Sequence, residues 1–287
     1  MIFIVLSILC SVTVAILLKL AKRYRINIIQ AVTVNYLIAA ALCAFFFKPE
    51  IRQINATAPW PIFIALAVLL PSVFLFLAAS VKNLGIVKTD IAQRLSLFIP
   101  ILAAYFIFNE NFNELKIVGI IFGFAAIILT LLRKTDRTSS GSWVYPVTVF
   151  IGFGVIDVLF KQIALYKALP YTTSLFTVFV LSLISSSIIV SVMVFTGKTK
   201  LQLVNFACGL ILGVFNFGNI LFYMKAHKAL SQNPSTVFAA MNFGVIIVGT
   251  LIGVIAFKEK LSKWNYLGII LALLAVTFIT LSQNAVR

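Results

Sequence analysis

Two ionisable residues lie four positions apart inside one long apolar run of the sequence. Asp157 and Lys161 fall between Trp143 and Leu165, and in a helix this spacing places both side chains on one face, with the acid before the base. A carboxylate in such surroundings could carry a proton or bind a cation, because burial and a neighbouring charge tune its ionisation. Alternatively, the two groups form a static ion pair. Both interpretations stay open, and Asp157 and Lys161 are the candidate coupling residues.

A second acid and base with the same spacing, Asp90 and Arg94, begin another apolar run. Ionisable groups inside a bilayer are costly, so they are expected to face protein or water rather than lipid. A guanidinium one or two turns inside could hold a carboxylate or a phosphate through two parallel hydrogen bonds. Arg94 is therefore a candidate substrate-binding residue, although Asp90 could also satisfy it near the membrane surface.

Three polar residues recur at helical spacing in the apolar run from residue 203 to residue 224: Asn216, Asn219 and Tyr223. Amides within a bilayer must find partners, so this face is predicted to point inward, toward a substrate or another helix. The candidate substrate-binding set extends to three further polar residues in apolar runs, Asn242, Asn35 and Tyr36.

Other conspicuous residues favour structural roles. Glu110 and Glu259 precede predicted helix starts, where a negative charge suits the helix dipole. The single histidine, His227, is predicted to lie at the membrane interface, with proton sensing as the alternative. Pro71 and Pro100 fall within apolar runs, where each would bend its helix, either as a hinge or as a static kink.

These residues must be positioned by membrane-spanning helices. The 287 residues are 62% hydrophobic and only 10% charged, with a mean hydropathy of +1.12, whereas soluble proteins carry about 25% charged residues. A spanning helix needs about 20 mostly apolar residues, so the chain has room for about ten spans and little else. The predicted fold class is an all-α integral membrane protein.

The apolar runs divide into five before residue 133 and five after residue 142. The first five cover about 2–20, 31–47, 60–80, 86–108 and 115–132, and the second five about 143–165, 172–195, 203–224, 235–257 and 264–281. The intervening stretch from Lys134 to Ser142 is polar and has the composition of a linker. We therefore predict two five-helix domains, residues 1–134 and 143–287.

The two halves share a common register. Aligning Glu110 with Glu259 also aligns Asn113 with Ser262, and the same register continues into the following apolar run. Asn113 and Ser262 are good N-cap residues, so each copy predicts a span, a tight turn and a new helix start. Because five is an odd number, the second copy must enter the membrane from the opposite face, which predicts two inverted repeats.

The segment from Pro100 to Leu132 has a proline within a span, Phe108-Asn-Glu110 at the turn and Gly119 opening the next span. It resembles the EamA-type repeat of the drug/metabolite transporter superfamily, and the segment from Gly249 to Leu281 resembles a second copy. The resemblance implies ten transmembrane helices around a central cavity, lined mainly by the third, fourth, eighth and ninth spans. It also implies exchange or proton coupling, without ATP.

The charge balance and the motifs restrict the partners. The chain has 23 Lys and Arg against 7 Asp and Glu, a net charge of +16. Most bases lie between apolar runs, so membrane lipid and not nucleic acid is the expected partner, and the side on which the termini lie stays open. The three cysteines lack metal or disulfide spacing. Enzyme motifs are missing as well, so we expect no catalysis, no metal and no cofactor.

We therefore expect a secondary transporter, an exporter or exchanger, for small polar metabolites such as amino acids or organic anions. It would lie in the bacterial inner membrane, with a proton or counter-substrate as its second ligand and an oligomeric state that the sequence leaves open. One alternative is a lipophilic-cation exporter, which needs an Asp157 that Lys161 does not neutralise. The other is a lipid-binding membrane protein without transport, for which a dry bundle is expected.

Overall fold

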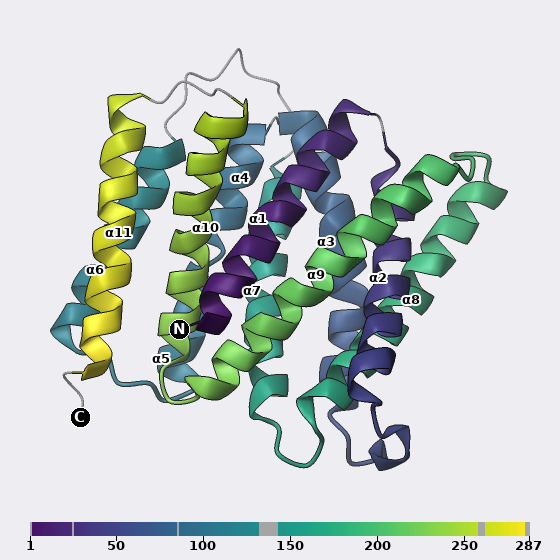
Figure 1. The fold of residues 1–287 in the computed structure, drawn as a ribbon, viewed down its shortest axis with the longest axis horizontal. Helices are drawn as coiled ribbons and strands as arrows, with labels where there is room; N and C mark the ends of the chain where they lie inside the picture. Colours follow the sequence, from purple (N-terminus) through teal and green to yellow (C-terminus); the bar gives the residue numbers. More distant parts are fainter. Residues whose placement is uncertain (1, 25, 85, 132–142, 258–261, 285–287) are drawn as a thin grey trace.

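The computed structural model describes residues 2–24, 26–84, 86–131, 143–257 and 262–284. These ranges contain α-helices, one short 3₁₀-helix and no β-strand (Figure 1). The helices before residue 132 are α1 (Ile2–Arg23), α2 (Ile28–Phe47), η1 (Ile51–Gln53), α3 (Trp60–Leu84), α4 (Ile86–Leu95), α5 (Phe98–Phe106) and α6 (Glu114–Leu131). The later helices are α7 (Val144–Leu165), α8 (Tyr171–Phe195), α9 (Leu203–Ala229), α10 (Pro234–Phe257) and α11 (Lys263–Asn284).

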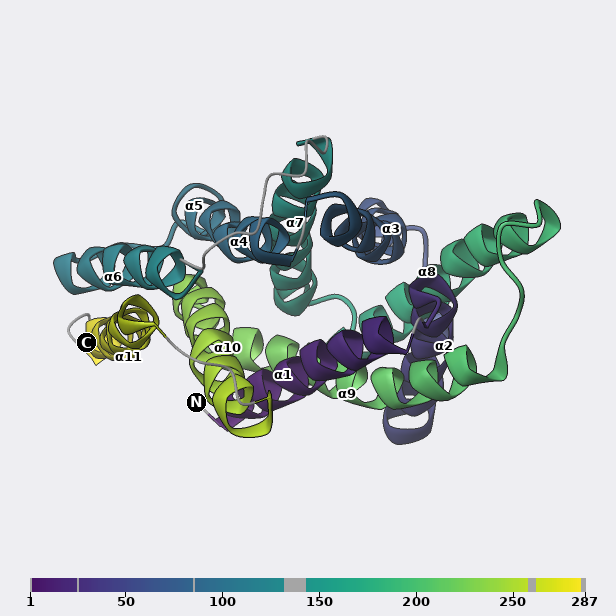
Figure 2. The same cartoon turned by 90° about the horizontal axis from the view of Figure 1, so that it is seen from above.

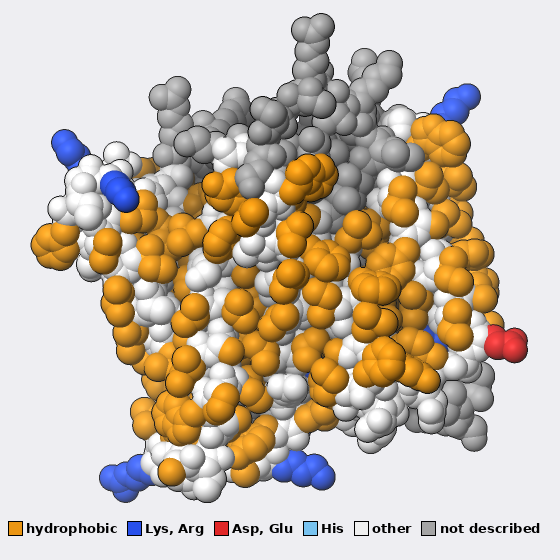
Figure 3. Space-filling model, turned by 180° about the vertical axis from the view of Figure 1, so that it is seen from behind, with side chains coloured by type: hydrophobic (Ala, Val, Ile, Leu, Met, Phe, Trp, Pro, Cys, Tyr) orange, Lys and Arg blue, Asp and Glu red, His pale blue; other side chains and the backbone are white. Residues whose placement is uncertain are grey.

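The helices have the length and surface of membrane spans. In the described part of the chain, 7 helices are long and apolar enough to cross a bilayer, and two shorter apolar segments cover Ile2–Leu18 and Ala92–Phe106. Figure 3 shows hydrophobic side chains over the whole visible face, with most visible Lys and Arg near its upper and lower ends. A surface of this kind suits lipid tails between two layers of head groups. The chain is therefore a multi-pass membrane protein.

The predicted runs agree with the helices within a few residues, except that the fourth span is two helices. α4 ends at Leu95 and α5 begins at Phe98. Pro100 explains the break, because it lacks an N–H and its ring crowds the carbonyl of Ser96, four residues earlier. The corresponding helix α10 is continuous and has Gly249 where α5 has Pro100. The prediction of a single fourth helix was wrong for this reason.

One glycine and a second proline show how local sequence shapes the spans. α7 packs close to the break in the fourth span, since a Cβ on Gly154 would lie only 2.9 Å from the carbonyl oxygen of Ser96. Pro71, by contrast, lies inside α3, which continues through it from Trp60 to Leu84. The kink predicted at Pro71 therefore does not interrupt its helix, whereas Pro100 lies beside a true interruption.

The helices form two rows, and α7 lies beside α3 and α4 and extends from one row toward the other (Figure 2). One row holds α3, α4, α5 and α6, and the other holds α11, α10, α1 and α9. α7 contacts α3, α4 and α5 of the first row and α9 of the second, while α2 and α8 pack together at one end of the molecule. The helix α7, which carries Asp157 and Lys161, thus contacts both rows, which also meet where α6 packs on α11.

α6 and α11 pair at the opposite end and run antiparallel. At one tip, Asn113 Nδ2 donates to the carbonyl of Ser282 at 2.9 Å, and at the other, Asn265 Nδ2 donates to the carbonyl of Leu129 at 3.4 Å. Side chains at the start of each helix therefore bind the last turns of the other.

Both predicted helix starts in this pair are confirmed. The Asn113 side chain accepts from the backbone N–H of Lys116 at 2.9 Å, as an N-cap of α6. Ser262 Oγ accepts from the backbone N–H of Asn265 at 3.2 Å, and Asn265 Oδ1 accepts from the N–H of Ser262 at 2.9 Å. The second pair is a reciprocal cap, which satisfies two backbone donors at once.

Candidate functional site

The polar strip of α9, formed by Asn216, Asn219 and Tyr223, faces the inside of the bundle. Asn216 and Tyr223 are each 7% exposed, and α1, α2, α7 and α10 pack around α9. The hydroxyl of Ser7 on α1 lies 2.8 Å from Asn219 Oδ1 and 2.9 Å from its carbonyl oxygen, and both accept from it. Asn216 makes no side-chain hydrogen bond within the described ranges. The strip therefore keeps the amide of Asn216 without a side-chain hydrogen bond among the described residues.

Asp157 meets the polar strip at Tyr223. The Tyr223 hydroxyl donates to Asp157 Oδ1 at 2.9 Å, and the Asp157 side chain is half-buried. The Tyr223 ring packs edge-on against His227, with centroids 4.6 Å apart, and His227 packs on Phe238 at 4.7 Å. This row of rings fixes the phenol. The contact joins α7 to α9 through a carboxylate whose partner is neutral.

Lys161, one turn after Asp157, is held elsewhere. Its ammonium donates to the carbonyl oxygens of Ser231 at 3.0 Å and His227 at 3.4 Å, and it lies 5.9 Å from the ring centroid of Phe108. The side chain is 0% exposed, and no ion pair between described residues joins it to Asp157. The static ion pair that the spacing allowed is not formed. Lys161 instead places a positive charge on carbonyls at the end of α9, where a cation stabilises the helix dipole.

His227, predicted to lie at the membrane interface, lies in the last turn of α9 and is buried against protein. Its exposed fraction is 0%, and neither ring nitrogen has a hydrogen-bond partner in the described part of the chain. The helix α9 continues to Ala229. Lys225 and Lys228 end the apolar run in the sequence, but not the helix. The last turn of α9 therefore carries a buried side chain.

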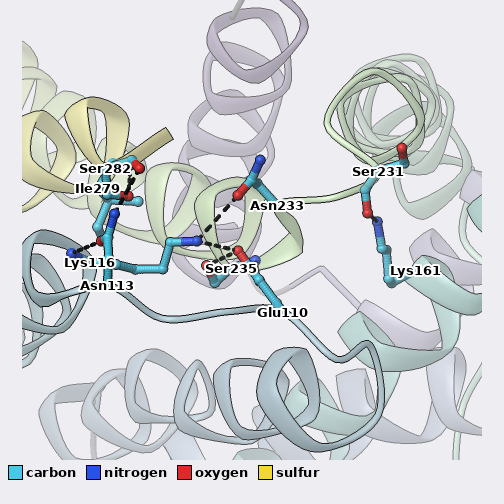
Figure 4. A network of polar contacts seen from close by, with 9 residues as sticks. All are labelled: Glu110, Asn113, Lys116, Lys161, Ser231, Asn233, Ser235, Ile279 and Ser282. Carbon is cyan, nitrogen blue, oxygen red and sulfur yellow. Dashed lines mark hydrogen bonds and ion pairs between the residues drawn. The ribbon is translucent and has the colours of Figure 1, made fainter. Parts of the chain in front are cut away.

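Glu110 and Lys116 form a buried ion pair, with Oε1 and Nζ 2.6 Å apart and both side chains 1% exposed (Figure 4). Glu110 also accepts from the backbone N–H of Ser235 at 2.8 Å and from its hydroxyl at 2.7 Å. Lys116 Nζ lies 3.3 Å from Asn233 Oδ1. The predicted role of Glu110 at the start of α6 needs correction, because its carboxylate binds the first turn of α10. A negative charge there suits the dipole of that helix.

The other predicted binding residues lie outside the polar strip. Asn35 and Tyr36 of α2 are 0% exposed, and the amide of Asn35 and the hydroxyl of Tyr36 have no hydrogen-bond partner among described atoms. Asn242 of α10 donates to the carbonyl of Phe238 in its own helix at 3.0 Å. Arg94 lies half-buried in the last turn of α4. The side chain of Asp90 lies outside the described residues, as does all of Glu259.

Sequence reasoning missed three contributors to this region. Ser7 and Ser235 are single hydroxyls in apolar segments, and their partners lie far away in the chain. Lys116 follows Glu110 across a turn, so no helical spacing links the two. In the sequence, the recurrence of the Glu110 turn in the second half predicted the turn itself. It did not predict which residues bind it.

One further feature lies apart from Asp157. A hollow of about 170 Å³ lies between α2, α8 and the start of α9, and none of the predicted site residues lines it. It is lined mainly by apolar side chains, with Gln30, Thr33 and Ser187 as the polar ones. Within the described residues, no group of three or more His, Cys, Asp or Glu could hold a metal ion.

The sequence profile of the EamA-like transporter family matches residues 1–132 and 142–281. An uncharacterized protein of Haemophilus influenzae (strain ATCC 51907 / DSM 11121 / KW20 / Rd) is 40% identical over 279 residues, which cover 94% of each chain. A protein crystal structure with 13% identity has a TM-score of 0.75 and matches 100% of this chain and 98% of that one. The last likeness concerns the fold alone.

Proposed function

The chain belongs to the EamA-like transporter family, and from this premise we propose a secondary transporter, an exporter or exchanger, for small polar metabolites such as amino acids or organic anions. One observation carries the proposal: an apolar bundle keeps a polar strip on α9 that meets the carboxylate of Asp157 in its interior. Polar groups at bilayer depth are costly, and they mark substrate or ion pathways in transport proteins.

The proposal includes two inverted five-helix repeats, residues 1–134 and 143–287. The helix contacts support it. When each helix is replaced by its counterpart in the other half, a helix pair in contact becomes another helix pair in contact. α2 packs on α9 as α8 packs on α3, and α1 packs on α9 as α7 packs on α3. The corresponding helices α6 and α11 pair with each other in antiparallel fashion. Inverted repeats enclose substrate sites between them in many secondary transporters.

The membrane and the second ligand are part of the same proposal. The bacterial source of the relative, Haemophilus influenzae, supports a bacterial membrane, and we propose the inner membrane. Asp157 is the candidate for carrying a proton, and a counter-substrate is the alternative second ligand. Lys161 is no longer favoured for coupling, since its ammonium is held by backbone carbonyls. Nucleic acid is not an expected partner.

A second candidate function is export of lipophilic cations. It is favoured by one observation, the lack of an ion pair between Asp157 and Lys161 among the described residues. A carboxylate that no cation neutralises can attract a positively charged drug, and the nearby rings of Tyr223 and His227 would add apolar surface.

The proposed function is tested with purified protein in liposomes. Radiolabelled amino acids, organic anions and a lipophilic cation are offered under a pH gradient and in exchange for internal substrate. We expect saturable movement of at least one amino acid, abolished by dissipating the gradient or by removing the internal counter-substrate. Movement of the lipophilic cation alone would favour the second candidate, and movement of none of these compounds would contradict the proposed function.

Arg94 has a separate test. Replacing Arg94 with alanine is expected to weaken transport of a carboxylate-bearing substrate by about tenfold or more, if the guanidinium binds that group. The protein should still elute as a folded species in gel filtration, because Arg94 is only half-buried. The matched control is Arg52→Ala, which removes an exposed arginine of η1. Equal transport by both variants would remove Arg94 from the site.

A further inference from the structure

The charged groups inside the bundle differ in how they are satisfied. Glu110 and Lys116 neutralise each other at 2.6 Å. Lys161 is fully buried on two backbone carbonyls. Asp157 has a single hydrogen-bond partner among the described residues, the neutral hydroxyl of Tyr223. A carboxylate partly removed from water is stabilised far better by a cation than by one neutral donor. The Asp157 carboxylate can therefore bind a positively charged partner.

We propose that Asp157 binds the ammonium group of the substrate, and that organic anions lacking an amine are not cargo of this protein. The inference rests on the proposed transport function and narrows its substrate class to amine-bearing metabolites, with amino acids as the favoured members. Lys161 is not part of this site, because its donors are already directed at Ser231 and His227.

The geometry at Asp157 matches the chemistry of an ammonium group. An ionised carboxylate has about four acceptor positions on its two oxygens. The Tyr223 hydroxyl occupies one of them on Oδ1, and the described residues supply no hydrogen bond to Oδ2. A primary ammonium has three donors and can bind both oxygens. The rings of His227 and Phe238 behind Tyr223 hold the phenol in place, so the acceptor positions that remain free are fixed.

The polar strip supplies uncharged donors for the remainder of an amino acid, in addition to Arg94, whose part in carboxylate binding has its own test. Asn219 lies one turn before Tyr223, about 6 Å along the helix axis. Its Oδ1 accepts from Ser7, which leaves its NH₂ group as a donor. Asn216, one turn further, has no side-chain hydrogen bond among the described residues. Amide donors of this kind can bind a substrate carboxylate that is already balanced by its own ammonium group.

The test measures binding and transport separately. The probes are the amino acids, their decarboxylated amines and their deaminated acids, matched in side chain. Binding is read as a rise in the thermal unfolding midpoint of the detergent-purified protein, since a ligand of the folded state raises its apparent stability. Transport of each compound that binds is then measured in liposomes. We expect stabilisation only by compounds that carry an amine.

Three variants accompany the probes. Asp157→Asn keeps the shape and an acceptor for Tyr223, and it should lower the affinity for amine-bearing compounds by at least about 30-fold. Tyr223→Phe retains the carboxylate and should lower this affinity by about tenfold. Glu114→Gln, which neutralises an exposed acid at the start of α6, should leave it within about twofold. The unfolding midpoint without ligand reports whether each variant folds.

The outcomes separate the two proposals. Amine binding that needs Asp157, without transport of any bound compound, supports the inference and contradicts the proposed function. Transport of deaminated acids at the same rate by the native protein and by Asp157→Asn supports transport and overturns the inference. The inference is also overturned if no amine stabilises the protein, or if Asp157→Asn removes only the response to a pH gradient while amines bind as before.

Discussion

Replacing Lys116 with methionine is expected to lower the free energy of unfolding by about 3–5 kcal/mol. Methionine fills much of the same volume, but it leaves the carboxylate of Glu110, 1% exposed, without the cation that lies 2.6 Å away in the native protein. The expected loss of stability is the penalty for leaving one buried charge uncompensated. It does not measure how much the intact ion pair contributes to stability. Unfolding of the purified protein in mixed micelles, followed by circular dichroism, measures the change.

A double variant distinguishes this cause from a loss of packing. Glu110→Gln in the Lys116→Met background removes the stranded charge and keeps an acceptor for the backbone N–H of Ser235. The double variant should therefore be more stable than Lys116→Met alone. The control Lys167→Met removes an exposed lysine of the α7–α8 connection and should change stability by less than about 0.5 kcal/mol. A double variant less stable than the single one would refute the electrostatic explanation.

Alanine at Gly209 and alanine at Gly249 are expected to have opposite effects. A Cβ on Gly209 would lie 2.5 Å from the carbonyl oxygen of Ala31 and 2.6 Å from Cβ of Val34, so α9 would be pushed away from α2. We expect a loss of about 1–3 kcal/mol. Gly249 has no neighbouring atom within 4 Å of such a Cβ, so alanine there should gain up to about 1 kcal/mol from reduced backbone entropy. The same unfolding assay compares both variants.

The result for Gly209 also bears on how the spans meet. Small residues let helices approach closely in a bilayer, where the hydrophobic effect does not drive their association. The next small residue of the same face, Gly213, packs against Ile38 and the carbonyl of Asn35. Equal stability of the Gly209 and Gly249 variants would mean that α2 and α9 can separate at little cost, contrary to their close packing.

The helices themselves were predictable because hydropathy and length leave few choices for an apolar chain of this size. The turn chemistry was predictable too, since Asn113 and Ser262 cap their helices locally. The break between α4 and α5 was only half visible. Pro100 predicted a bend, but whether a proline interrupts a helix depends on its neighbours, as the uninterrupted helix around Pro71 shows.

The site was predictable where one helix face carries the signal and not where partners come from distant segments. The spacing of Asn219 and Tyr223 predicted an inward face, and both bind other helices. The spacing of Asp157 and Lys161 placed them on one side of α7, yet the side chains diverge toward α9 and its following turn. Such choices depend on tertiary packing, which helical periodicity does not encode.

The turn between α9 and α10 has a consequence for how the chain is assembled. Among the described residues, the side chains that bind this turn and the start of α10 are Glu110, Lys116 and Lys161, and all three belong to segments translated earlier. When the turn between α9 and α10 reaches the bilayer, the side chains that bind its donors and acceptors have therefore already been synthesised. Synthesis from the N-terminus thus supplies the partners of this polar turn before the turn itself, two of them from the first half of the molecule and one from α7.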